Sequence, residues 1–118
     1  MQDLPKLKAV FFRMTSGREP VREWLLSVNK TERRQVGTDI AYVQFKWPIG
    51  KPRVDHLCGG IWEVRTRLEN RVARVLFAVA GGEMVLLHGF IKKTQKTASD
   101  DIELAEDRWK EWKNAQGK

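Results

Sequence analysis

Hydrophobic and polar residues alternate most clearly along residues 62–68. One side of this segment carries Trp62, Val64, Thr66 and Leu68, and the other carries Glu63, Arg65 and Arg67. Such alternation is typical of a strand with one face in the core. The next segment, residues 71–80, is rich in Val, Leu and Phe, and a third hydrophobic segment runs into basic residues that end at Lys96. The pattern predicts three consecutive β-strands between Trp62 and Lys96.

Three stripes of hydrophobic residues at helical spacing predict helices on both sides of these strands. The stripes consist of Val21, Trp24, Leu25 and Val28, of Val36, Ile40, Val43 and Trp47, and of Ile102, Ala105, Trp109 and Trp112. Pro20 suits the first position of the first helix, and Thr31 suits the N-cap of the second helix, which ends before Pro48. Thr97 or Ser99 is expected to cap the last helix.

The remaining segments complete an α+β fold. Lys8–Met14 has the composition of a first strand, whereas Pro48–Gly60, with two prolines and three glycines, is expected to be a loop. The predicted order is β-α-α-β-β-β-α, with the late strands joined by tight turns. This order favours a small antiparallel sheet carrying two N-terminal helices and one C-terminal helix. A length of 118 residues fits one domain, 1–118.

The composition favours a cytoplasmic protein with an acidic partner and no membrane association. A hydrophobic content of 42% is enough for a packed core, and no segment approaches the apolar length of a membrane span. The N-terminus lacks the apolar core of a signal peptide. The single cysteine, Cys58, excludes an internal disulfide and fits a reducing compartment. The net charge of +7 favours nucleic acid or an acidic protein as partner, and much of the positive charge falls between Arg65 and Lys96.

The turn between the first two of the three strands brings two arginines together. If Glu69-Asn70 forms a two-residue turn, Arg65 lies directly opposite Arg74 in an antiparallel pair. Two like charges in these positions destabilise a sheet. A purely structural explanation requires a counter-charge, for which Glu63 is the local candidate, or a solvated outer face. We favour an anionic ligand, and we expect replacement of either arginine by alanine to leave the fold intact.

The chain resembles a known toxin family in four segments. They are G-G-I-W-E-V-R (59–65), R-V-L-F (74–77), L-L-H-G-F-I-K-K-T-Q-K-T (86–97) and I-E-L-A-E-D-R (102–108). These segments are similar to those of the RelE/ParE toxin superfamily and, more narrowly, of its HigB-like, phage-derived branch in bacterial type II toxin–antitoxin modules. The resemblance implies a RelE-like fold with a small twisted antiparallel sheet. It also implies an mRNA interferase, a ribosome-dependent endoribonuclease that arrests translation and is silenced by a co-encoded antitoxin.

The resemblance implies roles for five basic residues. Arg65 matches the basic residue of the family's W-E-x-R strand, and Arg74 matches the arginine of the strand that follows. Lys92, Lys93 and Lys96 match the basic segment after the last strand. We therefore expect these side chains around the phosphate that is cleaved.

Two positions depart from the family pattern. Phe77 stands where many relatives have Tyr, and Ala98 stands where Pro is usual. Tyr42, the only tyrosine of the chain, lies in the second predicted helix. The sequence therefore does not support a tyrosine near the end of the chain as general acid or base.

Cleavage of RNA by its own 2′-hydroxyl requires a base, stabilisation of a dianionic transition state and a proton for the leaving oxygen. Arginine suits the second task, because its planar fork donates two hydrogen bonds to a phosphate. Lysines gathered among other cations can exchange protons near neutral pH. The sequence shows no cluster of Asp, Glu and His of the kind that holds Mg²⁺ or Zn²⁺, so we expect neither a metal nor another cofactor.

Eight residues form the expected site. The catalytic candidates are Arg65, Arg74, Lys92, Lys93 and His88, and the RNA-binding candidates are Arg67, Lys96 and His56. His88 is either a structural residue of the last strand or a general acid or base, depending on the face that it occupies. His56 is either a surface residue or a border of the RNA groove. Glu63 is expected first to orient an arginine, and only second to act as a base.

Three functions fit the sequence. The first is mRNA cleavage, whose partners are mRNA on the ribosome and an antitoxin, expected to be a helix-turn-helix protein encoded next to the toxin. The second is a ParE-like toxin that inhibits DNA gyrase and needs no phosphate-binding set on its sheet. The third is a non-catalytic RNA- or antitoxin-binding module, which is favoured if the missing tyrosine means lost activity.

Overall fold

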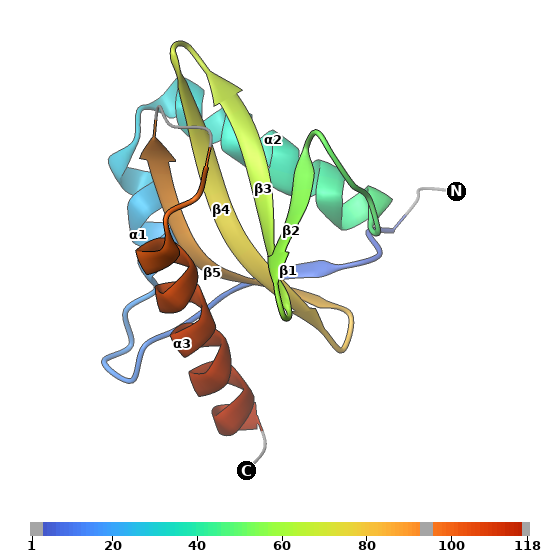
Figure 1. The fold of residues 1–118 in the computed structure, drawn as a ribbon, viewed down its shortest axis with the longest axis vertical. Helices are drawn as coiled ribbons and strands as arrows, with labels where there is room; N and C mark the ends of the chain where they lie inside the picture. Colours follow the sequence, from blue (N-terminus) through green and yellow to red (C-terminus); the bar gives the residue numbers. More distant parts are fainter. Residues whose placement is uncertain (1–3, 93–95, 117–118) are drawn as a thin grey trace.

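The computed structural model describes residues 4–92 and 96–116 and shows an α+β fold (Figure 1). The elements are β1 (Lys8–Phe11), α1 (Pro20–Ser27), α2 (Lys30–Lys46), β2 (Val54–Cys58), β3 (Ile61–Leu68), β4 (Arg71–Ala80), β5 (Glu83–Lys92) and α3 (Ser99–Gln116). The α+β class, the three predicted helices and the three consecutive strands are confirmed. Within the described residues, no helix is long and apolar enough to cross a membrane.

The sheet is mixed, with the strand order β1-β5-β4-β3-β2. The predicted strands β3, β4 and β5 pair antiparallel, as expected, and β2 also pairs antiparallel with β3, whereas β1 runs parallel to β5. The prediction of a wholly antiparallel sheet was therefore wrong for β1. Tight turns impose antiparallel pairing only on strands that follow one another, and two helices and three strands separate β1 from β5 in the chain.

Strand β2 lies inside the segment that the sequence analysis assigned to a loop. Val54 pairs with Val64 of β3, and Gly59, with φ of 48°, turns the chain between the two strands. The loop prediction was therefore wrong at residues 54–58, because prolines and glycines surround an edge strand too short to show alternation. The pairing of β2 with β3 ends at Val64, so the last part of β3 continues past β2 along the edge of the sheet.

Helices cover both faces of the sheet (Figure 1). Helices α1 and α2 pack on one face, and α3 crosses the other. The core under α2 includes Val36, Ile40, Val43, Val64, Val75 and Phe77, and the core under α3 includes Ile61, Leu76, Val85, Leu87 and Ala105. Toward the first turn of α3, charged side chains replace hydrophobic ones on the second face.

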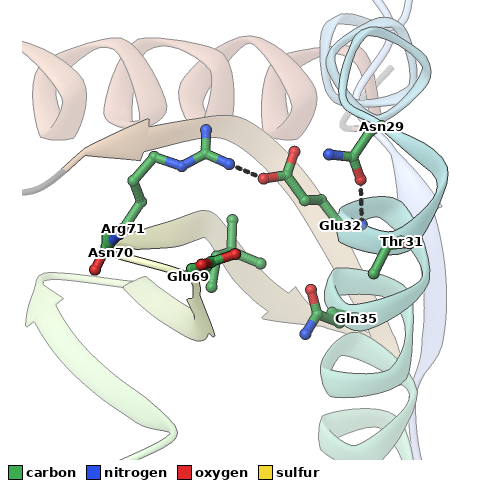
Figure 2. Close-up of a pocket in the computed structure, with 8 residues that line it drawn as sticks. Asn29, Thr31, Glu32, Gln35, Glu69, Asn70 and Arg71 are labelled. Carbon is green, nitrogen blue, oxygen red and sulfur yellow. Dashed lines mark hydrogen bonds and ion pairs between the residues drawn. The ribbon is translucent and has the colours of Figure 1, made fainter.

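The N-terminus of α2 holds the turn between β3 and β4 (Figure 2). Asn29 is the N-cap, and its side chain accepts a hydrogen bond from the N–H of Glu32 at 2.8 Å. Thr31, which we expected to be the N-cap, lies inside the first turn, so that prediction was wrong; asparagine is an equally good cap. Glu32 forms an ion pair with Arg71, the first residue of β4, beside a polar pocket of about 350 Å³. This contact holds the hairpin that carries the arginine pair.

Gly89 allows α1 to approach the sheet. A Cβ atom at this position would lie 2.8 Å from Cζ3 and 2.9 Å from Cδ2 of Trp24, which is too close for carbon atoms. Trp24 belongs to α1 and packs against the core on the α2 side of the sheet. The absence of a side chain at Gly89 is therefore a packing requirement.

Replacement of Gly89 by alanine is expected to destabilise the fold by about 1–3 kcal/mol, because the added methyl group forces the Trp24 ring away from the sheet. The free energy of unfolding in urea checks this. Gly37→Ala is the matched control: nothing lies within 4 Å of the added methyl group, and alanine is favoured inside a helix by roughly 1 kcal/mol. Equal effects of the two substitutions would show that residue 89 need not be small.

Candidate functional site

Three rows of residues cross β3, β4 and β5 on the face that α3 covers. They are Glu63–Leu76–His88, Arg65–Arg74–Phe90 and Arg67–Val72–Lys92. The predicted turn is confirmed, since Leu68 pairs with Arg71 and Asn70 has φ of 60°. Arg65 therefore lies directly opposite Arg74, as expected.

A shift in strand pairing decides which face His88 occupies. The register set by the Gly81–Gly82 turn would place His88 opposite Val75, whose side chain belongs to the core under α2. The pairing of β4 with β5 shifts by one residue, however, and His88 lies opposite Leu76. Because side chains alternate along a strand, the shift places His88, and with it Phe90 and Lys92, on the arginine face.

Glu63 is fully buried, with 0% of its surface exposed, and contacts both arginines. Its carboxylate accepts a hydrogen bond from Nε of Arg65 at 2.8 Å and lies 3.5 Å from Nη1 of Arg74. Thr97, a candidate helix cap in the sequence analysis, donates its hydroxyl to Glu63 and accepts from Nη1 of Arg74 at 2.8 Å. These four residues, called here the Glu63 cluster, tie the start of α3 to the sheet.

The arginine pair has its counter-charge within the protein. Besides Glu63, Asp55 of β2 lies 3.8 Å from Nη2 of Arg65. The sequence analysis required a counter-charge if the pair of arginines is purely structural, and Glu63 and Asp55 supply it. The like-charge pair alone therefore does not indicate an anionic ligand. Arg74 is only 1% exposed, so its loss would leave Glu63 buried with less compensation. The expectation that Arg74→Ala leaves the fold intact is therefore reversed.

Arg65 and Arg74 also border a cleft of about 690 Å³ at the edge of β3. The residues that line it are Asp39, Pro52, Arg53, Arg65, Arg67, Val72 and Arg74. Four arginines and one acidic residue make this arginine cleft cationic, as an anion-binding site requires. The side chain of Arg65 is 31% exposed, whereas that of Arg74 is buried and forms the inner wall.

Arg53 is the arginine of the cleft that the sequence analysis missed. Its carbonyl oxygen accepts a hydrogen bond from the N–H of Arg65 at 2.9 Å. Its guanidinium carbon lies 3.9 Å from the ring centre of Tyr42, and its Nε lies 3.6 Å from Asp39, both on α2. The assignment of residues 48–60 to a loop concealed this neighbour, because only a strand paired with β3 brings Arg53 beside Arg65.

His88 shares the carboxylate of Asp101 with Lys92. Nε2 of His88 lies 2.8 Å from Oδ1, and Nζ of Lys92 lies 2.6 Å from Oδ2. Burial alone would raise the pKa of Asp101, but the hydrogen bonds from Lys92 and His88 lower it, so the carboxylate is ionised at neutral pH. An ionised carboxylate only accepts hydrogen bonds, which assigns the proton of neutral His88 to Nε2 and leaves Nδ1 as an acceptor.

The remaining candidates lie at the margin of the site, on the other face, or outside the description. Lys96 is exposed and directly precedes Thr97, and Lys93 lies outside the described residues. His56 pairs with Trp62 on the face opposite the arginines, and its Nε2 lies 2.6 Å from the carbonyl oxygen of Gly59. In residues 4–92 and 96–116, no group of three or more His, Cys, Asp or Glu side chains could hold a metal ion.

Glu63→Gln is expected to lower the free energy of unfolding by about 3–5 kcal/mol, because Arg74 then stays buried without its carboxylate. The double variant Glu63→Gln, Arg74→Met is expected to recover part of the loss, since both charges leave the interior together. Urea denaturation of the two single variants and the double variant checks the coupling. Strictly additive effects would contradict it.

A second prediction concerns pH. Burial lowers the pKa of His88 below the ordinary value of 6.5, although its hydrogen bond to Asp101 opposes the shift. The unfolded chain therefore binds this proton more readily, and the contribution of neutral His88 to stability is complete above pH 6.5 and is lost as the pH falls below it. His88→Gln is expected to flatten the fall in unfolding free energy between about pH 7 and 5. The control is His56→Gln, which replaces the other histidine of the chain. If His88→Gln leaves the pH dependence of the unfolding free energy unaltered, the lowered pKa of His88 is contradicted.

Residues 23–110, which run from α1 into α3 and include the Glu63 cluster and the arginine cleft, match a protein family described as phage derived protein Gp49-like (DUF891). No curated protein matches the chain. The Gp49-like family is part of the RelE/HigB-like superfamily of toxin–antitoxin toxins, which are often endoribonucleases. Because the match spans most of the chain, this protein belongs to the phage-derived Gp49-like family and, through it, to the RelE/HigB-like toxin superfamily.

Proposed function

We propose that this protein is the toxin of a type II toxin–antitoxin module and acts as a ribosome-dependent mRNA endoribonuclease that needs no metal. The observation that carries the proposal is the arginine cleft, where four arginines converge beside one acidic residue. Membership of a toxin family supports it. Arginine is suited to a scissile phosphate because its planar guanidinium donates two hydrogen bonds to the phosphate oxygens.

Arg65 is the proposed phosphate-binding residue. The bond from its Nε to Glu63 orients the guanidinium, and its partly exposed side chain borders the cleft. Arg74 adds positive charge from the inner wall, and Arg67, exposed one row away, suits a flanking phosphate. Oriented cations stabilise a dianionic transition state without having to reorganise during the reaction.

The proposed reaction transfers the scissile phosphate within the RNA. The 2′-oxygen attacks the neighbouring phosphorus, the bond from phosphorus to the 5′-oxygen breaks, and a 2′,3′-cyclic phosphate remains. We assign to Nδ1 of His88, whose ring is oriented by Asp101, the role of accepting the 2′-hydroxyl proton. Lys92, held on the same carboxylate, is the proposed proton donor to the leaving 5′-oxygen. Lys93 is its neighbour in the sequence and shares this proposed role.

The ribosome is the proposed source of substrate alignment. Contacts to phosphates position a strand but carry no sequence information. Attack in line with the leaving oxygen requires the strand to be held in a reactive geometry, and correct orientation accounts for a large part of a reaction barrier. An mRNA bound in the ribosome is held in this way, whereas an RNA free in solution is not.

The proposed protein partner is an antitoxin, which membership of a toxin–antitoxin family implies. We expect a helix-turn-helix protein encoded next to the toxin. The net charge of +7 favours an acidic partner surface, and charge attraction between two proteins raises the rate of association in a salt-dependent manner.

Arg65→Ala and Arg65→Lys are both expected to abolish toxicity when the protein is induced in cells, because alanine removes the cation and lysine lacks the planar fork. Loss of one such group lowers a cleavage rate by about 10²–10³-fold. Translation arrest and new 5′ ends in cellular mRNA are the measurements. Arg22→Ala is the control, since Arg22 is an exposed arginine of α1 paired with Glu19 at 3.4 Å.

The other outcomes separate the alternatives. Toxicity with a DNA damage response and intact transcripts would overturn the proposal in favour of gyrase inhibition. A folded wild-type protein without toxicity would instead indicate a binding module. Full toxicity of a folded Arg65→Ala variant would overturn the role of Arg65.

A further inference from the structure

We propose that Arg53, stacked on Tyr42, is a platform for one unpaired base of the RNA at the rim of the arginine cleft. This inference rests on the proposed function and adds a nucleobase subsite to a site so far defined by phosphates. It also assigns a role to the only tyrosine of the chain.

The guanidinium of Arg53 is held by α2 on one side. Its central carbon lies 3.9 Å from the ring centre of Tyr42, and its Nε lies 3.6 Å from Oδ1 of Asp39. The Arg53 side chain is nevertheless 40% exposed and lines the cleft. Because Tyr42 contacts the guanidinium from α2 and the side chain is still 40% exposed at the cleft, we assign the base to the exposed part of Arg53 that Tyr42 does not cover.

The position of Arg53 is coupled to the phosphate-binding residue. Its carbonyl oxygen accepts the N–H of Arg65 at 2.9 Å, which continues the pairing of β2 with β3 by one more bond. Both side chains line the same cleft. A strand whose phosphate lies on Arg65 therefore brings a neighbouring nucleotide to Arg53.

The chemistry of the platform selects an unpaired nucleobase. Arginine planes and aromatic rings stack on bases in proteins that bind single-stranded RNA, and this stacking tolerates any base because every base has a π face. A base inside a duplex has both faces covered by its neighbours. The subsite therefore favours single-stranded RNA and supplies little sequence preference.

The test measures binding of two ligands by fluorescence anisotropy at low salt. One is a short single-stranded RNA, and the other is a ribose-phosphate oligomer of the same length without bases. Wild-type protein is expected to bind the RNA about tenfold more tightly than the abasic oligomer. Arg53→Lys keeps the charge but removes the plane, so its RNA affinity is expected to fall about tenfold while its affinity for the abasic oligomer stays the same.

Variants of Tyr42 test the platform from the other side. Tyr42→Phe keeps the ring and is expected to bind both ligands like wild type, whereas Tyr42→Leu removes the ring and is expected to lose affinity for the RNA alone. Arg22→Lys, on α1, is the matched control for an arginine-to-lysine change and is expected to have no effect. Urea denaturation confirms that each variant is folded.

The outcomes distinguish this inference from the proposed function. If folded Arg53→Lys binds both ligands like wild type, or loses affinity for both equally, the platform is overturned while RNA binding stands, and Arg53 is a structural or purely electrostatic residue. If wild-type protein binds neither ligand, the platform is overturned, whereas the proposed ribosome-dependent function is decided separately by toxicity and transcript cleavage in cells. Selective loss of RNA affinity in Arg53→Lys and in Tyr42→Leu supports the platform.

Discussion

The buried carboxylate of Glu63 is the interaction on which the site depends. Glu63 contacts two like charges, Arg65 and Arg74, which face each other across β3 and β4 and would repel each other more strongly without it. Glu63 contacts both arginines, and the hydroxyl of Thr97 connects this ion pair to the start of α3. One carboxylate therefore contacts both strands of the hairpin, orients Arg65 and holds Thr97 beside the start of α3. Stability and the proposed phosphate binding therefore both depend on this residue.

The hairpin of β3 and β4 could be predicted because its determinants are local. Alternation along residues 62–68 and a two-residue turn were enough to place Arg65 opposite Arg74. The role of Thr97 could not be predicted in the same way. Its residue type suggests a helix cap, whereas its partner Glu63 lies 34 residues earlier in the chain. Arg53 was missed for a related reason, since its position depends on an edge strand surrounded by prolines and glycines.

The face of His88 could not be predicted because a strand has a period of two. A single extra residue between the turn and His88 exchanges the two faces for the rest of β5. Leu87, the extra residue, lies in the core under α3 like Val85 before it, so the hydrophobic composition of β5 does not reveal the shift. The shift nevertheless places His88 and Lys92 in contact with Asp101, and this contact makes both residues candidates for proton transfer.

The same alternation decides where position 77, which departs from the family pattern described in the sequence analysis, lies in the sheet. Phe77 pairs with Trp62, is fully buried, and lies 5.7 Å from the ring of Trp47 in the core under α2. A hydroxyl at this position would point into that core, away from the arginine cleft. The proposed proton acceptor, His88, lies on the other face, where the shift in β5 places it beside Asp101. Phenylalanine at position 77 is therefore compatible with the proposed reaction, in which the shift in β5 serves to place His88.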